Sequence, residues 1–534
     1  MSIKTIAILV LIGAAAIVGI LVVSGPNRGG PVPKGAEQVV IFARSGDSHG
    51  LDPQETEWGE DVLVMDSLYE TLVRFKDGGA DLEPGLADSW SVQDGGRVWE
   101  FALRQNVYFH DGTLFTADAV VFSFDRLLKD QKDHPHSPVT RPYASMYEDI
   151  EKVEKIEQYK VRFVLKGPSA VFLKNAAMFP ASIVSPVAVR SKGDTFVSNP
   201  VGTGPMKFVR WEKNIKLEIA RNDSYWGKEL PGRAARVDRI IFLPVADAQV
   251  RVEKLRSGDA HIINNIGLAD LQALQKDPKI AISFAPAMNI CYLGFNMKLA
   301  PYNDQNFRHA VAHAVNLSKV VEKGYHGLAD QAVSIVPPSI WTGDGTAPKY
   351  ENSLEKAREL LKKVRLGSGE IVIWHPSFSR PYVPEPAKVA ISIKDDLVQL
   401  GLKVRIESLP IDAFRARIRG DDHPMFILGW STDNADPDNF FFALLHAASI
   451  GGNNNSFFDH PKFNEVVKRA QQEVDPTKRR ELYNQAEKLF KEELPVVPLV
   501  HVRQAVAFSK NVRFRMHPIE TRAYQIEFAA EETK

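Results

Sequence analysis

Hydrophobic and polar positions along the chain follow two periods, one typical of strands and one typical of helices. Short apolar runs bounded by polar or turn-forming residues predict strands. Strands and helical segments alternate, and no fixed-period repeat joins them, so the pattern predicts a mixed α/β protein and excludes a solenoid or a propeller. The predicted strands cover residues 39–42, 98–103, 161–165, 216–220, 240–243, 371–374 and 425–428.

Other segments carry an apolar stripe at spacings of three and four residues, which predicts helices that pack one face on a core. Thr116 and Asp304 stand directly before two of these segments and are suitable N-caps. After the last stripe, the run 494–500 leads into strand-like pieces at 512–515 and 524–528, so we expect the tail to belong to a sheet. The predicted helices cover residues 117–128, 307–315, 389–400 and 482–490.

The N-terminal segment 6–23 has no charged or strongly polar residue. Residues 1–24 fit two interpretations, a secretory signal peptide that is cleaved or a membrane anchor that is retained, since roughly 18 apolar residues can just span a bilayer. Both predict that the body of the protein is exported. Residues 25–36 are rich in Gly and Pro and predict a linker before the folded body.

Composition narrows the classes of partner and site. Lys plus Arg and Asp plus Glu both number 66, and this balance gives no reason to expect a nucleic acid as partner. The single cysteine, Cys291, lies in a strand-like run, so it cannot form an intrachain disulfide and is predicted to be packing material. No cysteine follows the N-terminal segment to carry a lipid.

Three short motifs resemble catalytic or ligand-binding sites but lack the residues those sites require. Ser48 lies in a G-x-S-x-G pattern, yet Pro53 opposes the helix that a nucleophile elbow needs directly after the serine, so a serine hydrolase remains only an alternative. His134 and His136 have no further ligands at metal-binding spacing. The glycines of 201–205 match neither a dinucleotide loop nor a P-loop. We therefore expect no catalytic residue, metal site or cofactor.

Two loops at the ends of predicted strands carry the candidate binding residues. The segment 429–442 packs three carboxylates among aromatics after strand 425–428. In it, Asp433 is a candidate acceptor for a cation, with Trp430 as an apolar or cation–π wall, while Asp436 and Asp438 are expected to shape the turn. The second loop carries Arg380 after strand 371–374, and its planar guanidinium suits a carboxylate.

The chain resembles a known family in segments that are weak alone but occur in a characteristic order. Over residues 37–528 it is similar to the bacterial extracellular solute-binding proteins, family 5, the peptide/nickel class, and most like the dipeptide-binding components of ABC transporters. Segment 429–441 carries the resemblance to the dipeptide branch. The other matching segments are 51–53, 84–90, 109–112, 116–123, 199–205 and 307–315.

The resemblance implies a two-lobed periplasmic-binding-protein fold of class II, of the large peptide-binding type with an extra subdomain. Lobe I would comprise residues 37–286, with the subdomain at about 78–203, and lobe II would comprise 287–503. Residues 504–534 would return to lobe I, so two hinge strands would join the lobes and the ligand would lie between them.

The resemblance also implies what the protein binds and where. Asp433 corresponds to the family residue that holds the peptide α-ammonium and Arg380 to the one that holds the α-carboxylate, with Trp430, Ser431 and Tyr382 lining the pocket. The protein would be a monomer in the periplasm, tethered to the inner membrane if residues 6–23 are retained. It would deliver di- or short peptides to an ABC transporter permease. Haem, a nickel chelate or an antimicrobial peptide remain alternative ligands.

Overall fold

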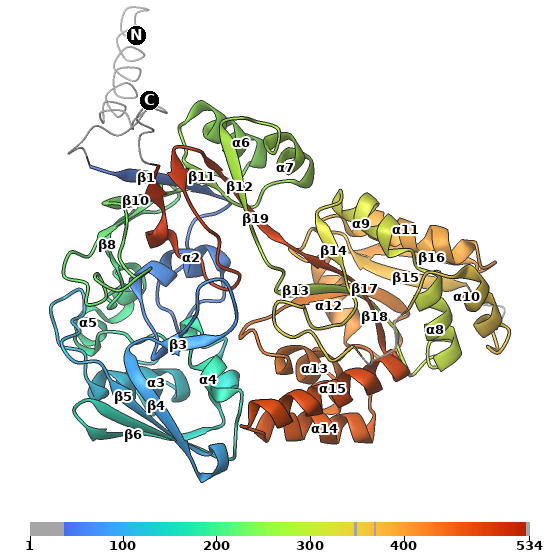
Figure 1. Ribbon diagram of the computed structural model, residues 1–534, viewed down its shortest axis with the longest axis horizontal. Coiled ribbons are helices and arrows are strands. Elements are labelled where there is room, and N and C mark those ends of the chain that lie inside the picture. Colours follow the sequence, from blue (N-terminus) through green and yellow to red (C-terminus); the bar gives the residue numbers. More distant parts are fainter. Residues whose placement is uncertain (1–36, 346–349, 368–369, 530–534) are drawn as a thin grey trace, which may run out of the picture.

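The computed structural model describes residues 37–345, 350–367 and 370–529 (Figure 1). The predicted signal or anchor and the linker lie outside these residues. Within the described ranges, no helix has the length and apolar character needed to cross a membrane. The prediction of a mixed α/β protein is confirmed, because helices and several sheets alternate along the chain.

The first lobe is built on a seven-stranded sheet in the order β12-β19-β11-β1-β10-β9-β8. Strand β1 pairs in parallel with both β10 and β11, and its residues after the first are buried. A continuous apolar run of this kind is typical of a strand covered on both faces. The strands are β1 (Val39–Arg44), β8 (Met206–Glu212), β9 (Lys216–Arg221), β10 (Arg239–Pro244), β11 (Ile262–Ile263), β12 (Ile280–Ala285) and β19 (Gln504–Ser509).

A smaller antiparallel sheet, in the order β4-β5-β7-β6, extends the first lobe downward in Figure 1. The amphipathic helix α3 (Ala117–Leu128) packs on β6 and β7 of this sheet. Strands β2 (Val73–Phe75) and β3 (Leu82–Pro84) form a separate hairpin before it. The elements of this part are β4 (Ala87–Gln93), β5 (Val98–Leu103), β6 (Ile150–Glu157), β7 (Lys160–Leu165), α4 (Phe172–Asn175) and α5 (Pro186–Lys192).

The second lobe is built on a six-stranded sheet in the order β14-β18-β13-β17-β15-β16. Alternate residues of β13 face two different hydrophobic clusters: Cys291 and Leu293 lie in one, Ile290 and Tyr292 in the other. Both faces of this sheet are therefore covered, as the period of two along a strand requires. The strands are β13 (Asn289–Gly294), β14 (Ala329–Gln331), β15 (Ile371–Pro376), β16 (Val404–Leu409), β17 (Met425–Ser431) and β18 (Val496–Val502).

Helices of the second lobe divide between these two faces. Residues of α8, α9 and α11 belong to the cluster that contains Cys291, and residues of α12 to α15 belong to the opposite cluster. The helices are α8 (Gln305–Ala314), α9 (Leu317–Tyr325), α10 (Leu354–Leu361), α11 (Pro386–Val398), α12 (Ile411–Ile418), α13 (Asp438–Leu445), α14 (Pro461–Gln472) and α15 (Pro476–Glu493).

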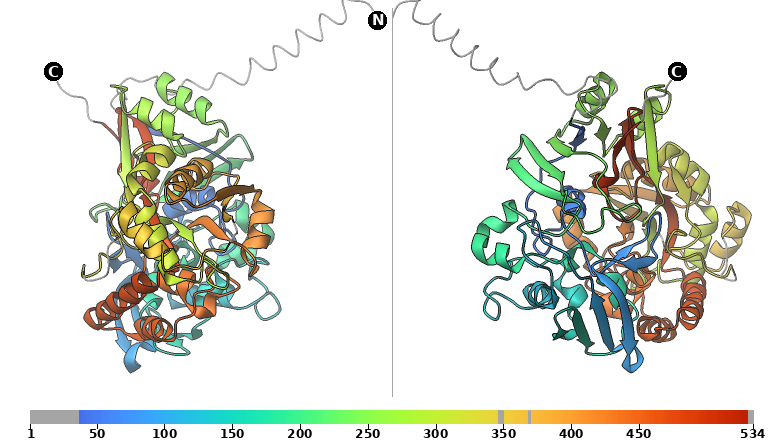
Figure 2. Two further views of the ribbon diagram at one scale, coloured as in Figure 1. Left: turned by 90° about the vertical axis from the view of Figure 1, so that its right-hand side faces the viewer. Right: turned by 60° about the vertical axis from the view of Figure 1, so that its left-hand side comes forward.

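The chain passes between the two large sheets twice, from β12 to β13 and back from β18 to β19. Strand β19 then lies alongside β12 in the first lobe, where the two pair antiparallel (Figure 2). The tail is thus part of a sheet, as predicted. The predicted lobe boundaries at 286/287 and 503/504 fall in these two connections and stay a prediction, as does the range 78–203 for the subdomain.

Most predicted elements are confirmed, with differences at their ends. Asp304 caps α8 by accepting hydrogen bonds from the N–H groups of Asn306 and Phe307. Thr116 stands at the N-cap position of α3, but its side chain makes no capping bond. The strand expected at 524–528 is wrong in its first half, because Ala523–Gln525 forms a 3₁₀ turn and only β21 (Glu527–Phe528) pairs with β20 (Val512–Arg513).

Candidate functional site

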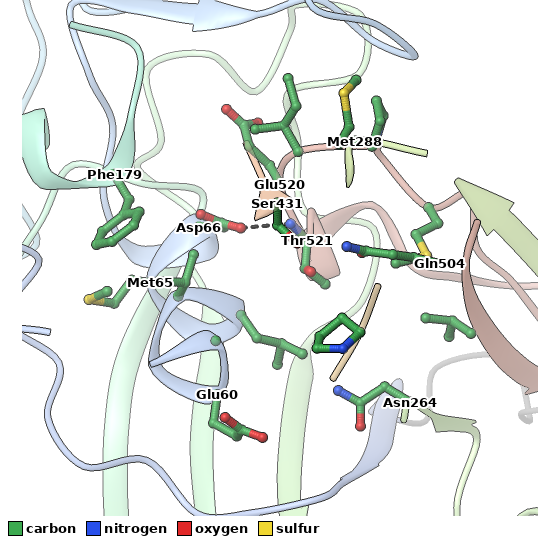
Figure 3. A pocket seen from close by; sticks show the side chains of 18 of the residues that line it. Glu60, Met65, Asp66, Phe179, Asn264, Met288, Ser431, Gln504, Glu520 and Thr521 are labelled. Atoms are coloured by element: carbon green, nitrogen blue, oxygen red, sulfur yellow. Dashed lines mark hydrogen bonds between the residues drawn. The ribbon is translucent and has the colours of Figure 1, made fainter. Parts of the chain in front are cut away.

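A cavity of about 990 Å³ lies between the lobes and takes its walls from both of them. The first lobe contributes Tyr143, Met178 and Phe179, and the second contributes the loops after β15 and β17. Met288 and Gln504, which flank the two chain crossings, complete the wall (Figure 3). The cavity therefore depends on how the lobes meet.

The topology of the second sheet explains why two loops distant in sequence reach this cavity together. Strands β15 and β17 are parallel neighbours, so their carboxyl ends lie at the same edge of the sheet. Ligands of open α/β sheets bind outside this edge. The loop after β15 carries Arg380 and the loop after β17 carries Asp433, and both residues line the cavity.

Asp433 is held by Asn439, which lies in the first turn of α13. The Asp433 N–H donates to Asn439 Oδ1 over 3.1 Å, and Asn439 Nδ2 donates to Asp433 Oδ2 over 3.4 Å. Burial raises the pKa of the Asp433 carboxyl to about 6, against the opposing effect of the Asn439 hydrogen bond. No basic side chain among the described residues lies within 4.0 Å of this carboxylate, so it can accept a cation from a ligand.

Arg380 also has no carboxylate partner in the part of the chain that the structure describes. Its Nε donates to the hydroxyl of Tyr382 over 3.4 Å, and its guanidinium carbon lies 5.6 Å from the centre of that ring. The backbone of Arg380 bridges to Val383, which closes the loop into a tight turn. This arrangement presents a fixed, unpaired guanidinium to the cavity.

Ser431 lines the cavity, as the resemblance implied, whereas Trp430 and Tyr382 are not among its lining residues. Trp430 Nε1 donates to Asn439 Oδ1 over 2.8 Å and thereby supports the residue that holds Asp433. Tyr382 is buried beneath Arg380. The polar end of the Trp430 ring thus contacts the support of Asp433, and the hydroxyl of Tyr382 contacts Arg380 itself. That either ring contacts a ligand stays a prediction.

The other two acids of the 429–442 segment shape the turn, as predicted. Asp436 is 1% exposed and forms two hydrogen bonds with Arg479, of 2.8 and 2.7 Å, which lower the pKa of its carboxyl against the effect of burial. Asp438 begins α13 and accepts from Gln471 Nε2 over 3.1 Å. Burial and the neighbouring Asp436 raise the pKa of Asp438 to about 7.

The sequence did not indicate the acidic wall that the first lobe adds to the cavity. Asp66 near the end of α2 (Gly59–Leu68) accepts from the N–H of Thr521 over 2.6 Å (Figure 3). Burial and the nearby Glu520 carboxylate raise the pKa of Asp66 well above its usual range, while Arg522 and Arg74 help to lower that of Glu520. Only the fold brings α2 and the tail together, so no local motif could have revealed this wall.

The motifs set aside in the sequence are accounted for by packing. Ser48 is buried, its hydroxyl accepts from Arg44 Nη1 over 2.9 Å, and the next helix begins only at Gly59. The strand–serine–helix geometry of a nucleophile elbow is therefore missing at Ser48. His134 and His136 both contact the ring of Phe122. No group of three His, Cys, Asp or Glu side chains in the described ranges could hold a metal ion.

Comparison with known proteins places this geometry in a family. Residues 81–452 match the model of the bacterial extracellular solute-binding proteins, family 5 Middle. The di/tripeptide-binding protein 1 of Pseudomonas aeruginosa is 33% identical over 507 residues, which cover 91% of this chain and 93% of that protein. The heme-binding protein A of Haemophilus influenzae is 31% identical over 452 residues, 81% of each chain.

A solved structure supports the same assignment. The periplasmic binding protein DppA of Helicobacter pylori, in complex with the peptide STSA, is 30% identical and superposes with a TM-score of 0.74. The match covers 92% of this chain and 98% of that one. It confirms the two-lobed fold that the resemblance implied, and with it the chain belongs to the bacterial extracellular solute-binding proteins, family 5.

Proposed function

We propose that this protein is the substrate-binding component of a peptide ABC transporter. It binds di- or short peptides between its lobes and delivers them to a permease in the inner membrane. The observation that carries the proposal is the pair of opposite charges, Asp433 and Arg380, on neighbouring loops of one interlobe cavity. Neither has an ion-pair partner among the described residues, so both are available to a zwitterionic ligand.

The proposed roles follow from the chemistry of a free peptide. Ionised Asp433 accepts hydrogen bonds from the α-ammonium, and Arg380 binds the α-carboxylate through its planar fork. Charges fixed at both ends select ligand length, because each added residue lengthens an extended peptide by roughly 3.5 Å. Lobe closure removes water from both ion pairs and thereby strengthens them.

The rest of the cavity wall suits variable side chains. Met178, Phe179 and Met288 line it, and methionine adapts to apolar groups of different shape. A volume of about 990 Å³ is at the upper end for small-molecule sites, so the cavity has room for bulky residues or a third residue. The two terminal charges of the peptide would then determine whether it binds, and its side chains would modulate the affinity.

Haem is the second candidate ligand, favoured by the size of the cavity and by the likeness to a heme-binding protein. The lining contains no histidine or cysteine among the described residues, so iron coordination would fall to a tyrosine such as Tyr143 or to a methionine. An absorbance spectrum of the protein mixed with haem separates this ligand from a peptide. A nickel chelate or an antimicrobial peptide would be recognised by metal analysis or by direct titration.

The same proposal covers cellular role and location. We expect a monomeric receptor in the periplasm that binds without turnover, as the family description and the peptide-binding relative suggest. Residues 6–23 would serve as a cleaved signal or as a tether to the inner membrane, and N-terminal sequencing of the mature protein distinguishes the two.

Calorimetry with blocked peptides tests the site. A dipeptide should bind the wild type, and N-acetylation or C-amidation should each weaken binding at least tenfold, since one charge then remains buried without a partner. Asp433→Asn should strongly weaken binding of the free dipeptide but leave binding of the N-acetylated dipeptide almost unchanged. Arg380→Gln should also weaken binding of the free dipeptide but leave binding of the C-amidated dipeptide almost unchanged. Asp259→Asn and Arg365→Gln, at exposed positions outside the cavity, are the matched controls. If neither site variant changes binding, the assignment fails.

A further inference from the structure

The loop 432–437, which carries Asp433, also contacts the first lobe. Asn434 Nδ2 donates to Asn175 Oδ1 over 2.8 Å, and Asn434 is 2% exposed. Asn175 ends α4, a helix of the first lobe, whereas Asn434 follows β17 of the second. In Figure 1, α4 lies toward the lower end of the molecule and the crossing between β18 and β19 lies above it. The contact therefore joins the lobes at a distance from the hinge.

The side-chain amide of each asparagine makes a second hydrogen bond within its own lobe. Asn175 Nδ2 donates to the carbonyl of Met146 over 2.9 Å, which leaves Oδ1 to face Asn434. Asn434 Oδ1 accepts from the N–H of Asp436 over 3.1 Å, so the same side chain also stabilises the turn of its own loop. Each amide is thus oriented by one lobe and completed by the other.

The surroundings of the pair are closely packed. The Ala170 N–H donates to the Gln471 carbonyl over 2.8 Å, a backbone hydrogen bond between the lobes. A Cβ atom on Gly96 would lie 2.5 Å from Cγ1 of Val474, so only glycine allows this approach. The side chain of Ala435 belongs to the hydrophobic cluster of the first lobe. The two lobes are therefore in close contact around this partly buried hydrogen bond.

The contact is directly connected to the candidate ligand site. Asp433 precedes Asn434 in the chain, and its charge contributes, after burial, to a raised pKa of the Tyr143 hydroxyl, so Asp433 faces the first lobe across the cavity. Tyr143, Met178 and Phe179 line the cavity beside α4. Closing the lobes therefore fixes the loop and forms the wall opposite Asp433 in a single movement.

We propose that Asn175 is a positioning residue for Asp433: by binding Asn434, it holds the loop 432–437 in its ligand-binding form when the lobes close. The site at Asp433 for the peptide ammonium is then complete only when the loop 432–437 of the second lobe contacts the first lobe. This inference rests on the proposed function. It explains why the residue next to the acid is a buried amide rather than an apolar side chain, and it makes ligand retention depend on a residue outside the cavity wall.

Dissociation kinetics test the proposal. Asn175→Ala and Asn434→Ala should each increase the dissociation rate of a dipeptide about tenfold, with association changed less than twofold, because the partly buried interlobe hydrogen bond of the closed form is lost. The increase in the dissociation rate of the double variant should be less than the product of the two single increases, since the interlobe hydrogen bond is lost in all three variants. Gln272→Ala is the control, because Gln272 Nε2 also bonds across the lobes, to the His326 carbonyl over 2.9 Å, but away from the Asp433 loop. Additive single effects, or an equal effect of the control, overturn the proposal.

Hydrogen exchange gives a readout that does not need the ligand. Asn175→Ala should speed amide exchange in residues 432–436, although 259 positions separate the two asparagines, and should leave the other loops of the second lobe unchanged. If the wild type binds no dipeptide, the proposed function fails, while this measurement still decides the contact. Unchanged exchange at 432–436 overturns the inference, and a melting temperature close to that of the wild type shows that the variant is folded.

Discussion

Asn439 donates from its amide nitrogen to the Asp433 carboxylate and accepts the Asp433 N–H at its amide oxygen, so one side chain holds both the backbone and the charge of the candidate ligand acceptor. The same oxygen accepts from Trp430 Nε1. A partly buried carboxylate with a single side-chain donor keeps a raised pKa, and a ligand ammonium would lower it again. Asp433 is thus prepared for a positively charged group.

The pH dependence of peptide binding follows from this state. The Asp433 pKa is about 6 in the ligand-free protein, and only the ionised form pairs with an ammonium. Affinity should therefore be constant near pH 7 and decrease below pH 6, toward about tenfold per pH unit. In Asp433→Asn this acidic limb should disappear. Calorimetric titrations between about pH 4.5 and 8 make the comparison, and a wild-type affinity that stays flat down to about pH 5 would contradict the assignment.

The stability of the ligand-free protein should change in the opposite direction. Because the folded-state pKa of Asp433 lies above its ordinary value of 3.8, the folded state binds more protons than the unfolded state between the two values. This group's contribution therefore destabilises the fold as pH rises through that window. Asp433→Asn should raise the unfolding free energy at pH 7.5 by on the order of 1–3 kcal/mol, with little change near pH 4. Urea unfolding of both proteins at the two pH values measures this difference.

Trp430 should act through Asn439 and not through contact with the ligand. Trp430→Phe keeps an aromatic ring but removes the donor to Asn439 Oδ1, so it should weaken binding of every dipeptide by a similar factor, corresponding to about 1 kcal/mol. A residue of the cavity wall would instead discriminate among ligand side chains. Titration with a panel of dipeptides that differ at one position decides the matter, and Trp211→Phe, a substitution of a first-lobe tryptophan outside the cavity, is a matched control.

Much of the fold could be predicted because strands such as β1 and helices such as α8 carry their burial pattern and caps in neighbouring residues. Asp433 and Arg380 could be predicted as candidates because both stand in loops directly after apolar strands. The residues that position these two side chains could not be predicted from the sequence. Asn439 is a local neighbour with no distinctive motif, and Asn175 meets Asn434 only through a contact between lobes, which no local spacing encodes.

Gly429 should be required for the position of Tyr382. A Cβ at this position in β17 would lie 2.3 Å from the Ile290 carbonyl oxygen and 2.3 Å from Cδ2 of Tyr382. Gly429→Ala should therefore destabilise the protein by about 1–3 kcal/mol, as overpacked cores do. The substitution should also weaken the binding of peptides with a free carboxylate, because Tyr382 supports Arg380. Gly167→Ala is the control, since a Cβ there meets nothing within 4 Å; thermal unfolding and calorimetry compare the two.

The ion pair between Asp436 and Arg479 should contribute to the stability of the second lobe rather than to binding chemistry. Arg479 comes from α15 and also donates to Tyr483 over 2.9 Å, so it ties the loop after β17 to the long helix. Arg479→Met leaves Asp436 buried without its partner and should cost on the order of 3–5 kcal/mol. Asp436→Asn combined with Arg479→Met should cost less, because no unpaired charge then remains buried.

The pH response separates this pair from Asp433. The pKa of Asp436 is lowered in the folded protein, so its stabilising contribution is present above its ordinary pKa of 3.8 and is lost as pH falls through the folded value. Wild type and the double variant should therefore converge in unfolding free energy at low pH and diverge toward neutrality, where the double variant is the less stable. Asp433→Asn should also converge with wild type at low pH, but toward neutrality it should become the more stable of the two. Urea unfolding of the three proteins at about pH 3 and about pH 7, on either side of this window, tests both signs. If the double variant lost as much stability at pH 3 as at pH 7, the loss would come from packing around α15, and the ion pair would not be its cause.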